Sequence, residues 1–447
     1  MKKRWLEVSE GADNKQEELF GRFVSGEGFS FNSEQAKIAY QERATLVKDA
    51  VQLKKIPKRI AICLSGGSFP LEYSGVTWKE AMYEPQKLVK AFEKYADHFP
   101  GDFVEMGGSA YTGKIFDILD FKLCVWAGHG LEENKAFQYI EKDYLKAEEY
   151  QDLIDDPTGW FLNVYFPRIF GSLEGFKYFP ILPAINEMPS VPGFVAAFAN
   201  QALAASINDL QQSAQASSEW SQIVGQAART RSAQGYPFLG GGGTKAPFDV
   251  LGDTLRGTKE IMMDMFRRPE LVIEACERLT PIMVKSGVND CLQSGNPLCF
   301  IPLHKGADGF MTDEQFKTFY WPTLRQLIIG LIDQGVVPLL FAEGGYNSRL
   351  ETIAQEQPRG KTIWYFDKTD MKLAKSTVGK DSCIMGNVPV DLLYAGTPDE
   401  VITHCKTLIE VAGKDGGYIF STGAGMQGVK AENIRAMLDT VKEYGVY

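Results

Sequence analysis

Three short apolar runs in the last third of the chain each lead into a polar residue. The polar residues are Glu343, Asp367 and Asn387, and the runs before them cover residues 338–341, 362–366 and 383–385. A strand that is buried on both faces of a parallel sheet is a continuous apolar run. In a (β/α)8 barrel, polar residues just past the carboxyl ends of the strands form the ligand-binding face. The pattern therefore predicts a parallel α/β sheet with a functional site at one end.

The same combination recurs along the chain and extends the predicted sheet. Further strands are expected over residues 59–64, 103–106, 298–303 and 418–421. Helices are expected over residues 78–95, 258–266, 269–286, 313–334 and 431–444. This alternation is typical of a (β/α)8 TIM barrel, in which one strand, still unassigned near the 135–235 region, would complete the set of eight.

Composition along the chain indicates additions to this barrel. Residues 1–58 are rich in Glu, Lys and Gln with apolar residues at helical spacing, which predicts an N-terminal helical extension. Residues 59–447 would form the barrel, and residues 135–235 within them predict a helical insertion that acts as a cap. The glycine run at 240–243 is expected to be a loop or hinge, because a regular element there would lose much backbone entropy.

Bulk composition excludes several classes of protein. The 447 residues are 44% hydrophobic, enough for a large core, and the net charge of -10 disfavours binding to nucleic acid. The first residues are followed by charged residues and not by the apolar core of a secretory signal. The most apolar long window, 191–210, is interrupted by proline, glycine and amide residues. We therefore expect neither a nucleic-acid partner nor a membrane span.

Cysteine usage predicts the compartment. The seven cysteines occur singly, with no CxxC pair. Such thiols are mostly small core residues in a reducing environment, whereas secreted domains use a dense disulfide framework. We therefore expect a cytoplasmic enzyme that acts on a small molecule.

Short motifs in the second half of the chain are shared with a known superfamily. They are APFD at 246–249, LRG at 255–257, MFRRPELV at 265–272, GNVPVDLL at 386–393, GTPDEV at 396–401 and ENIRAM at 432–437. These segments resemble the uroporphyrinogen decarboxylase superfamily. The resemblance is weak over residues 59–130 and good over residues 240–447.

The resemblance implies a (β/α)8 barrel, commonly a homodimer, with one of two activities. One branch decarboxylates a porphyrinogen, whose carboxylates are bound by an arginine-rich segment, but the matching residues 62–73 contain no arginine. The other branch resembles methylcobamide:coenzyme M methyltransferases, which move a methyl group between a corrinoid protein and a small acceptor. The chain is closest in type to this second branch.

The methyltransferase branch also implies a zinc ion, held by a His-x-Cys motif and a later cysteine. The positions that match these ligands hold Phe341, Glu343 and Ala424, so a zinc site with thiolate ligands is not expected. Glu343 and His304 are candidates for a rebuilt metal site. An acceptor nitrogen, such as that of a pterin, fits this loss better than a thiol.

Residues that follow the predicted strands make up the candidate catalytic site. Glu343 is the first candidate for a general base, because a carboxylate at a barrel strand end is desolvated; pairing with Arg349 is the alternative. His304 could transfer a proton, or it could be a core histidine bonded to backbone. Asp367 is the third catalytic candidate, for contact with substrate or metal.

Other residues are assigned to substrate binding. Asn387 could donate to a substrate oxygen, or hold its own loop by bonding backbone. Lys305 could orient an anionic group, or form an ordinary local salt bridge. The remaining candidates are Tyr346, Phe310 and Met106, whereas His98, His129 and His404 are expected to be structural.

Together with these residues, the resemblance implies a methyltransferase. It would move a methyl group between a corrinoid (cobalamin), carried on a partner protein, and a small acceptor such as a tetrahydropterin. One alternative is a corrinoid-independent decarboxylase or lyase that acts on a small carboxylic acid with the same carboxylate and histidine. Another is a non-catalytic protein that binds a tetrapyrrole or corrinoid, as the lost zinc ligands suggest.

Overall fold

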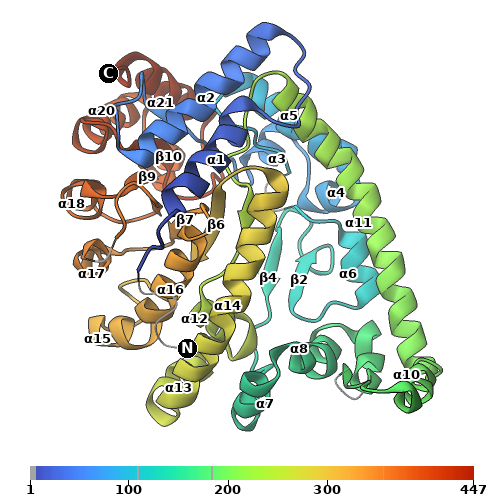
Figure 1. The fold of residues 1–447 in the computed structure, drawn as a ribbon. Helices are drawn as coiled ribbons and strands as arrows, with labels where there is room; N and C mark the ends of the chain where they lie inside the picture. The colour runs from blue at the N-terminus through green and yellow to red at the C-terminus, as the bar shows by residue number, and fades with distance from the viewer. Residues whose placement is uncertain (1–6, 108–109, 183–184, 356) are drawn as a thin grey trace.

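The computed structural model describes residues 7–107, 110–182, 185–355 and 357–447 (Figure 1). Its centre is a seven-stranded parallel sheet in the order β1-β10-β9-β8-β7-β6-β5. The strands are β1 (Ala61–Ile62), β5 (Gly242–Gly243), β6 (Leu298–Leu303), β7 (Val337–Ala342), β8 (Ile363–Phe366), β9 (Cys383–Val388) and β10 (Tyr418–Thr422). The predicted α/β class is confirmed, and strands lie within or over the apolar runs at 59–64, 298–303, 338–341, 362–366, 383–385 and 418–421.

The sheet is apolar on both faces because alternate residues of each strand enter different clusters. In β7, Leu340 and Ala342 pack into the outer cluster with the surrounding helices. Val337 and Leu339 of the same strand pack into the inner cluster. A strand covered on both sides has no polar alternation, which explains the continuous apolar runs in the sequence.

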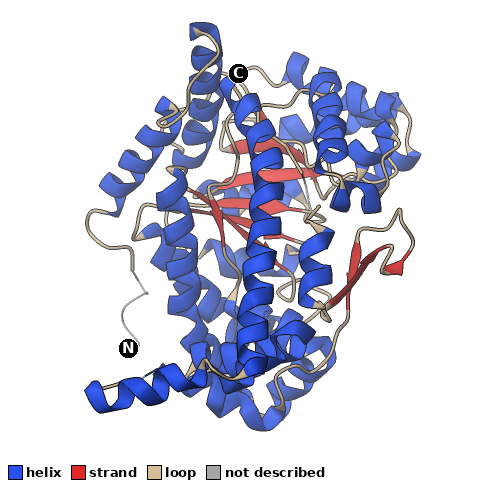
Figure 2. Cartoon of the chain, turned by 90° about the vertical axis from the view of Figure 1, so that its right-hand side faces the viewer, coloured by secondary structure: helices blue, strands red, loops and turns tan. Residues whose placement is uncertain are grey.

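Helices cover the outside of the sheet (Figure 2). They include α5 (Pro85–His98), α13 (Gly257–Arg267), α14 (Pro269–Ser294), α16 (Trp321–Ile332), α18 (Met371–Ser376), α20 (Pro398–Leu408) and α21 (Ala431–Tyr444). The helix expected over 78–95 is broken at Pro85 into α4 (Trp78–Tyr83) and α5. Proline is tolerated in a first helical turn but not inside a helix, so a new helix begins there.

The amino-terminal helices α1 (Ala12–Ser25) and α2 (Glu34–Gln52) close one end of the sheet. Phe20 and Phe23 of α1 and Val47 of α2 join the inner cluster with the first residues of the strands, such as Leu298 and Ile363. Of the predicted 1–58 extension, residues 12–25 and 34–52 are helical. These helices seal the amino-terminal ends of the strands, which leaves the carboxyl ends for a site.

The strand expected over residues 103–106 is wrong, because this segment forms no ladder. The Asp102 amide donates to Ile62 O at 2.8 Å, and the Val104 amide donates to Pro237 O at 2.8 Å. The Asp102 carboxylate also accepts from the Ile62 amide at 2.8 Å. The Asp102 side chain thus accepts a hydrogen bond from a backbone amide of β1 that would otherwise bond a neighbouring strand. Single bonds, and not a strand ladder, connect this segment to β1 and to Pro237, which precedes β5.

The glycine run contains a strand, contrary to the expected loop. Gly242 and Gly243 form β5 and pair in parallel with Cys299 and Phe300 of β6. A Cβ atom at Gly242 would lie 2.5 Å from Asp290 Cβ and 3.0 Å from Cys291 N, both on α14. Glycine is therefore present because the strand touches the helix, and the entropy argument for a loop was outweighed by packing.

Replacing Gly242 by alanine should therefore destabilise the protein. The added methyl group must displace α14, and overpacking of this kind typically costs about 1–3 kcal/mol. Gly240→Ala is the matched control, because its Cβ would meet nothing within 4 Å, and its effect should stay within about 0.5 kcal/mol. Urea unfolding measures both variants. Equal effects would show that contact with α14 is not what requires glycine.

A small sheet lies at the start of the predicted 135–235 insertion, which is mostly helical after it (Figure 2). Only its third strand falls within the predicted bounds. The sheet contains β2 (Cys124–Ala127), β3 (Gly130–Leu131) and β4 (Phe137–Tyr139). The helices that follow include α7 (Tyr150–Asp155), α10 (Val191–Ala197) and the long α11 (Gln201–Ala233). In the described part of the chain no single helix is long and apolar enough to cross a membrane; Met188–Ala197 and Gln201–Ala233 pass that test only as a pair bent by 75°.

Candidate functional site

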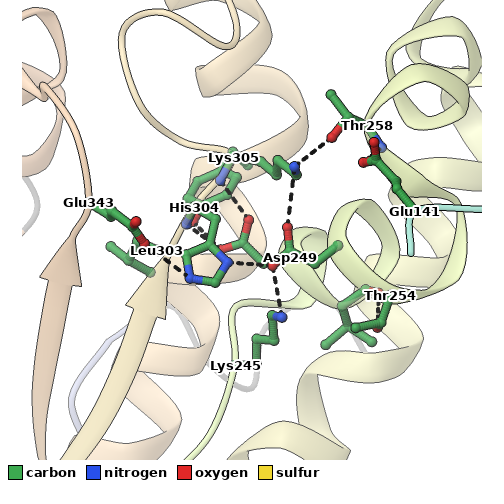
Figure 3. Close-up of polar contacts among 12 residues, drawn as sticks. Glu141, Lys245, Asp249, Thr254, Thr258, Leu303, His304, Lys305 and Glu343 are labelled. Carbon is green, nitrogen blue, oxygen red and sulfur yellow. Dashed lines mark hydrogen bonds and ion pairs between the residues drawn. The ribbon is translucent and has the colours of Figure 1, made fainter. Parts of the chain in front are cut away.

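Side chains from three neighbouring segments meet at the carboxyl ends of β5, β6 and β7 (Figure 3). His304 follows β6 directly, and Glu343 follows β7 directly. Asp249 ends α12 (Pro247–Asp249), and Asp253 lies one turn later in η6 (Val250–Leu255). The two carboxylates are four residues apart on a helical segment, so they lie on one face of it. Parallel strands place their carboxyl ends at one edge, which brings these residues together.

The imidazole of His304 lies between two carboxylates. Its Nδ1 is 2.6 Å from Asp253 Oδ2, and its Nε2 is 3.4 Å from Glu343 Oε2. The hydrogen bond with Asp253 raises the pKa of His304, against the opposing effect of burial. Asp253 therefore fixes the ring through Nδ1, and Nε2 faces a carboxylate whose side chain is 55% exposed. This geometry allows a proton to be held or moved between Nε2, Glu343 and a bound molecule.

Asp253 is also paired with two lysines. Lys245 Nζ lies 2.8 Å from its Oδ2, and Lys305 Nζ lies 3.4 Å from its Oδ1. Burial alone would raise the pKa of Asp253, but the His304 hydrogen bond and the Lys245 charge outweigh it and lower the pKa to about 2. Asp253 is thus an ionised partner for His304 throughout the neutral range.

Asp249 holds the backbone at the end of β6. Its fully buried carboxylate accepts from the His304 amide at 3.1 Å, the Lys305 amide at 2.9 Å and the Tyr320 hydroxyl at 2.7 Å. Burial, and then the charge of Asp253, raise its pKa to about 6, so it is mostly ionised at pH 7. Asp249 does not touch the imidazole, but it sets the position of His304.

Lys305 lies close to Phe310, and both residues were assigned to substrate binding from the sequence. Its Nζ lies 5.2 Å from the centre of the Phe310 ring and donates to Thr258 Oγ1 at 2.8 Å. The Thr258 amide in turn donates to the Glu141 carboxylate. The ion pair with Asp253 means that the local salt bridge considered from the sequence is present.

Asp367 and Asn387 lie beside this cluster at the ends of β8 and β9. The Gly344 amide donates to Asp367 Oδ2 at 3.0 Å, which connects Asp367 to the loop that carries Glu343. Burial raises the pKa of Asp367. Asn387 Nδ2 donates to the backbone oxygens of Asp367 and Thr369 at 3.1 and 2.7 Å, so its amide holds the loop, which was the alternative from the sequence. Both residues line a groove of about 1020 Å³.

Two other residues considered from the sequence, Tyr346 and Arg349, support the backbone near the site and do not contact the imidazole of His304. Tyr346 is fully buried, and its hydroxyl donates to Leu303 O at 3.3 Å, so it supports the strand end and does not wall a pocket. Arg349 pairs with Asp308 and Asp313, so the alternative that it neutralises Glu343 is wrong.

Met106 packs in a separate apolar cluster with Leu71, Trp78 and Met82, away from His304. Its assignment to substrate binding followed from the expected strand end, which does not form. The preceding residue, Glu105, lines a cavity inside the sheet and was missed. The sequence signal for Glu105 was a single carboxylate within an apolar run. Asp249 and Asp253 were also missed, and their signal was the four-residue spacing.

The residues present do not fit a zinc ion with thiolate ligands. Phe341 lies against Tyr365, with ring centroids 4.6 Å apart, and Ala424 lines the groove beside Asp367. All seven cysteines are buried, and none contacts His304 within the described residues. Within the same residues, no group of three or more His, Cys, Asp or Glu side chains is arranged to hold a metal ion.

Comparison with known proteins decides the family. The family model described as uroporphyrinogen decarboxylase (URO-D) matches residues 188–444, which is more than half of the chain. The chain belongs to the URO-D family. This confirms the resemblance inferred from the motifs between residues 246 and 437. The matched region includes β6 to β10 and therefore His304, Glu343, Asp367 and Asn387.

Relatives of this URO-D family member are distant. A uroporphyrinogen decarboxylase of Neisseria meningitidis is 27% identical over 212 residues, which cover 46% of this chain and 58% of the relative. One from Psychromonas ingrahamii is 27% identical over 234 residues, which cover 50% of this chain and 64% of the relative. The matches thus span about three fifths of the length of the curated relatives.

A solved structure shares the fold of this URO-D family member over nearly its whole length. It is a methyltransferase from Methanosarcina mazei, with a TM-score of 0.60, 14% sequence identity and coverage of 91% of this chain and 98% of that one. At this identity the similarity concerns the fold. It extends over the amino-terminal half, which the family model does not match.

The contact between Asp253 and His304 predicts a pH effect. Because Asp253 stabilises the imidazolium, the pair's contribution to stability is fully present below about pH 6.5, the ordinary pKa of histidine, and is lost as the pH rises through the raised pKa. Asp253→Asn should lower the pKa of His304. NMR titration of the imidazole measures it, and an unchanged midpoint in the variant would contradict the contact.

Proposed function

We propose that the protein is a methyltransferase that moves a methyl group between a corrinoid co-substrate, carried on a partner corrinoid protein, and a nitrogen of a small acceptor such as a tetrahydropterin. The observation that carries this proposal is the imidazole of His304 between Asp253 and Glu343 at 2.6 and 3.4 Å. The similarity in fold to a methyltransferase over 91% of the chain supports it. As in other members of the superfamily, the active form would be a homodimer.

The proposed chemistry needs a group that takes one proton. An acceptor N–H must lose its proton when its nitrogen forms a bond to the methyl carbon, while the cobalt–carbon electron pair returns to cobalt. His304 Nε2 would receive that proton, and Asp253 would stabilise the resulting imidazolium through Nδ1. Glu343 Oε2, 3.4 Å from Nε2, would orient the acceptor and pass the proton to solvent. In the reverse direction the same groups would protonate the leaving nitrogen.

A decarboxylase or lyase is the second candidate, because the curated relatives are decarboxylases at 26–27% identity. Protonated His304 could then deliver a proton to the carbanion that loss of CO₂ leaves. A porphyrinogen substrate is disfavoured, since residues 62–73 contain no arginine to bind its carboxylates. Turnover of a small carboxylic acid without any corrinoid would favour this candidate.

The test is an anaerobic assay with the purified chain. Methylcobalamin and candidate acceptors, or cob(I)alamin and candidate methyl donors, are mixed with the protein and followed by ultraviolet-visible spectroscopy. Protein-dependent interconversion of the two corrinoid spectra supports the proposal. Absence of both reactions with every donor and acceptor, in protein that is folded, overturns it.

Glu343→Gln separates an enzyme from a non-catalytic corrinoid-binding protein. Glutamine keeps the size of the side chain but cannot take a proton, so turnover should fall about 100-fold or more. Corrinoid binding, measured by spectral titration, should stay unchanged. Glu314→Gln, on an exposed carboxylate of α15 (Asp313–Gln315), is the control. Full activity in Glu343→Gln would argue against a catalytic role for this carboxylate.

A further inference from the structure

A cavity of about 440 Å³ lies inside the sheet, apart from the residues around His304. Its walls come from the inner face of β6 to β9, the end of β1 and the segment 103–105. This is the side on which Asp102 and Val104 donate single backbone hydrogen bonds to Ile62 of β1 and to Pro237. The volume falls within the range of pockets that bind small molecules.

Aromatic rings form much of this wall. They are Tyr95, Phe99, Phe103, Phe300 and Tyr365. The Tyr365 hydroxyl donates to Thr422 O at 2.9 Å, so its polar end is bonded to β10 and the ring is left to line the cavity. Aromatic faces carry negative electrostatic potential and attract cations within about 6 Å.

One carboxylate, Glu105, enters the cavity wall without a counter-charge. The Gly66 amide donates to its Oε1, and in the part of the chain that the structure describes no lysine, arginine or histidine pairs with it. Burial raises the pKa of Glu105 to about 8, which reflects the cost of an ionised carboxylate here. At pH 7 this carboxyl group is therefore mostly protonated, and a positive charge bound beside it would favour its ionised form.

Two further polar side chains, Tyr95 and Arg231, lie in the cavity wall. The hydroxyl of Tyr95, a residue only 2% exposed, lies next to the Glu105 carboxyl group, and its hydrogen bond partly offsets the effect of burial on the pKa of Glu105. Arg231 also lines the cavity, but its Nη1 bonds Asp97 at 2.9 Å and its guanidinium lies 4.2 Å from the Tyr236 ring centre. The charge of Arg231 is therefore paired with Asp97 and not with Glu105. The ionised form of Glu105, surrounded by aromatic rings, is complementary to an organic cation.

We propose that this cavity binds an N-methylated ammonium ion, with its methyl groups against the aromatic rings and its charge next to the Glu105 carboxylate. A quaternary ammonium has no N–H to donate, so ring faces suit it better than water does, and one carboxylate balances its charge. The aromatic and carboxylate groups come from different strands and helices, which makes the site a built pocket of the fold.

Binding of this ion does not depend on the proposed methyl transfer. If methyl transfer takes place, the bound ion would serve as the methyl donor. The electron pair of Co(I) would form the cobalt–carbon bond, and the C–N bond would break with its pair left on the neutral amine. No proton is needed in that direction. Since binding is measured without corrinoid, its failure and the failure of methyl transfer are seen separately.

The test is calorimetric titration of the full chain with choline and with its uncharged carbon isostere, 3,3-dimethylbutanol. The two probes have nearly the same shape and differ in charge. Choline should bind saturably with one site and at least about 10-fold more tightly than the isostere, which corresponds to about 1.4 kcal/mol. Equal affinity for the two probes, or no binding of choline to folded protein, would overturn the proposal.

Two variants and one control locate the binding in this cavity. Glu105→Gln should weaken choline at least about 10-fold and leave the isostere unchanged, and Phe300→Leu should weaken choline several-fold. Glu219→Gln, on the exposed surface of α11, should change neither. Unaltered choline affinity in folded Glu105→Gln would overturn the assignment. Should that variant fail to fold, Phe300→Leu and the comparison of the two probes still decide.

Discussion

His304→Gln is expected to lower the turnover number for methyl transfer by about 100- to 10,000-fold, the usual contribution of a general acid or base. Glutamine can still occupy the space next to Asp253, but it cannot bind and release a proton near neutral pH. The fold should be retained, because the backbone amide of His304 keeps its bond to Asp249 at 3.1 Å. Steady-state kinetics and unfolding curves measure the two properties.

The matched control is His98→Gln. His98 is exposed at the end of α5, where its Nδ1 lies 2.8 Å from the Tyr73 hydroxyl. Loss of that surface contact should leave turnover unchanged. A His304→Gln variant with near-normal turnover would remove this imidazole from the mechanism, and a large effect of His98→Gln would indicate indirect effects of histidine replacement.

Asp249→Ala should produce the largest loss of stability among the site variants. It leaves the amides of His304 and Lys305 and the hydroxyl of Tyr320 without their acceptor. Each buried donor left unsatisfied costs about 1–3 kcal/mol, so the free energy of unfolding should fall by roughly 3 kcal/mol or more. Such a value lies at or above the upper end of the usual range for one substitution. Turnover should fall as well, because the end of β6 positions the imidazole.

Two comparison variants make this prediction specific. Asp249→Asn keeps the volume and one acceptor oxygen, so it should destabilise less than alanine does. Asp439→Ala, on the exposed face of α21, removes a carboxylate without buried partners and should stay within about 0.5 kcal/mol. Urea unfolding measures all of them. A loss below about 1 kcal/mol in Asp249→Ala would mean that water replaces the carboxylate.

The sequence predicted the elements whose local signal and packing agree. β7, β8 and β9 are continuous apolar runs because helices cover one face and the inner cluster covers the other. α21 has the predicted bounds because its apolar residues repeat at helical spacing. Glu343 and Asp367, which follow β7 and β8, were identified for the same reason, since the position of a strand end follows from its apolar run. Asn387 lies inside β9, because this strand extends past the apolar run to Val388.

Features that depend on contacts between distant segments could not be predicted in this way. β5 is made of glycine because α14 lies against it, and residues 103–106 fail to pair because the Asp102 side chain binds β1. The ring of His304 contacts Asp253, which lies 51 residues earlier in a helical turn without any strand signal. Only the three-dimensional arrangement shows that these side chains meet.

The pH dependence of methyl transfer in the parent protein and in Asp253→Asn tests the central claim most directly. If His304, held by Asp253, takes the acceptor proton, the rate rises with pH through the raised pKa of the imidazole. Without the carboxylate, the midpoint of this rise should move to lower pH. The same midpoint in both proteins, or a rate that does not depend on pH in the parent, would contradict the account.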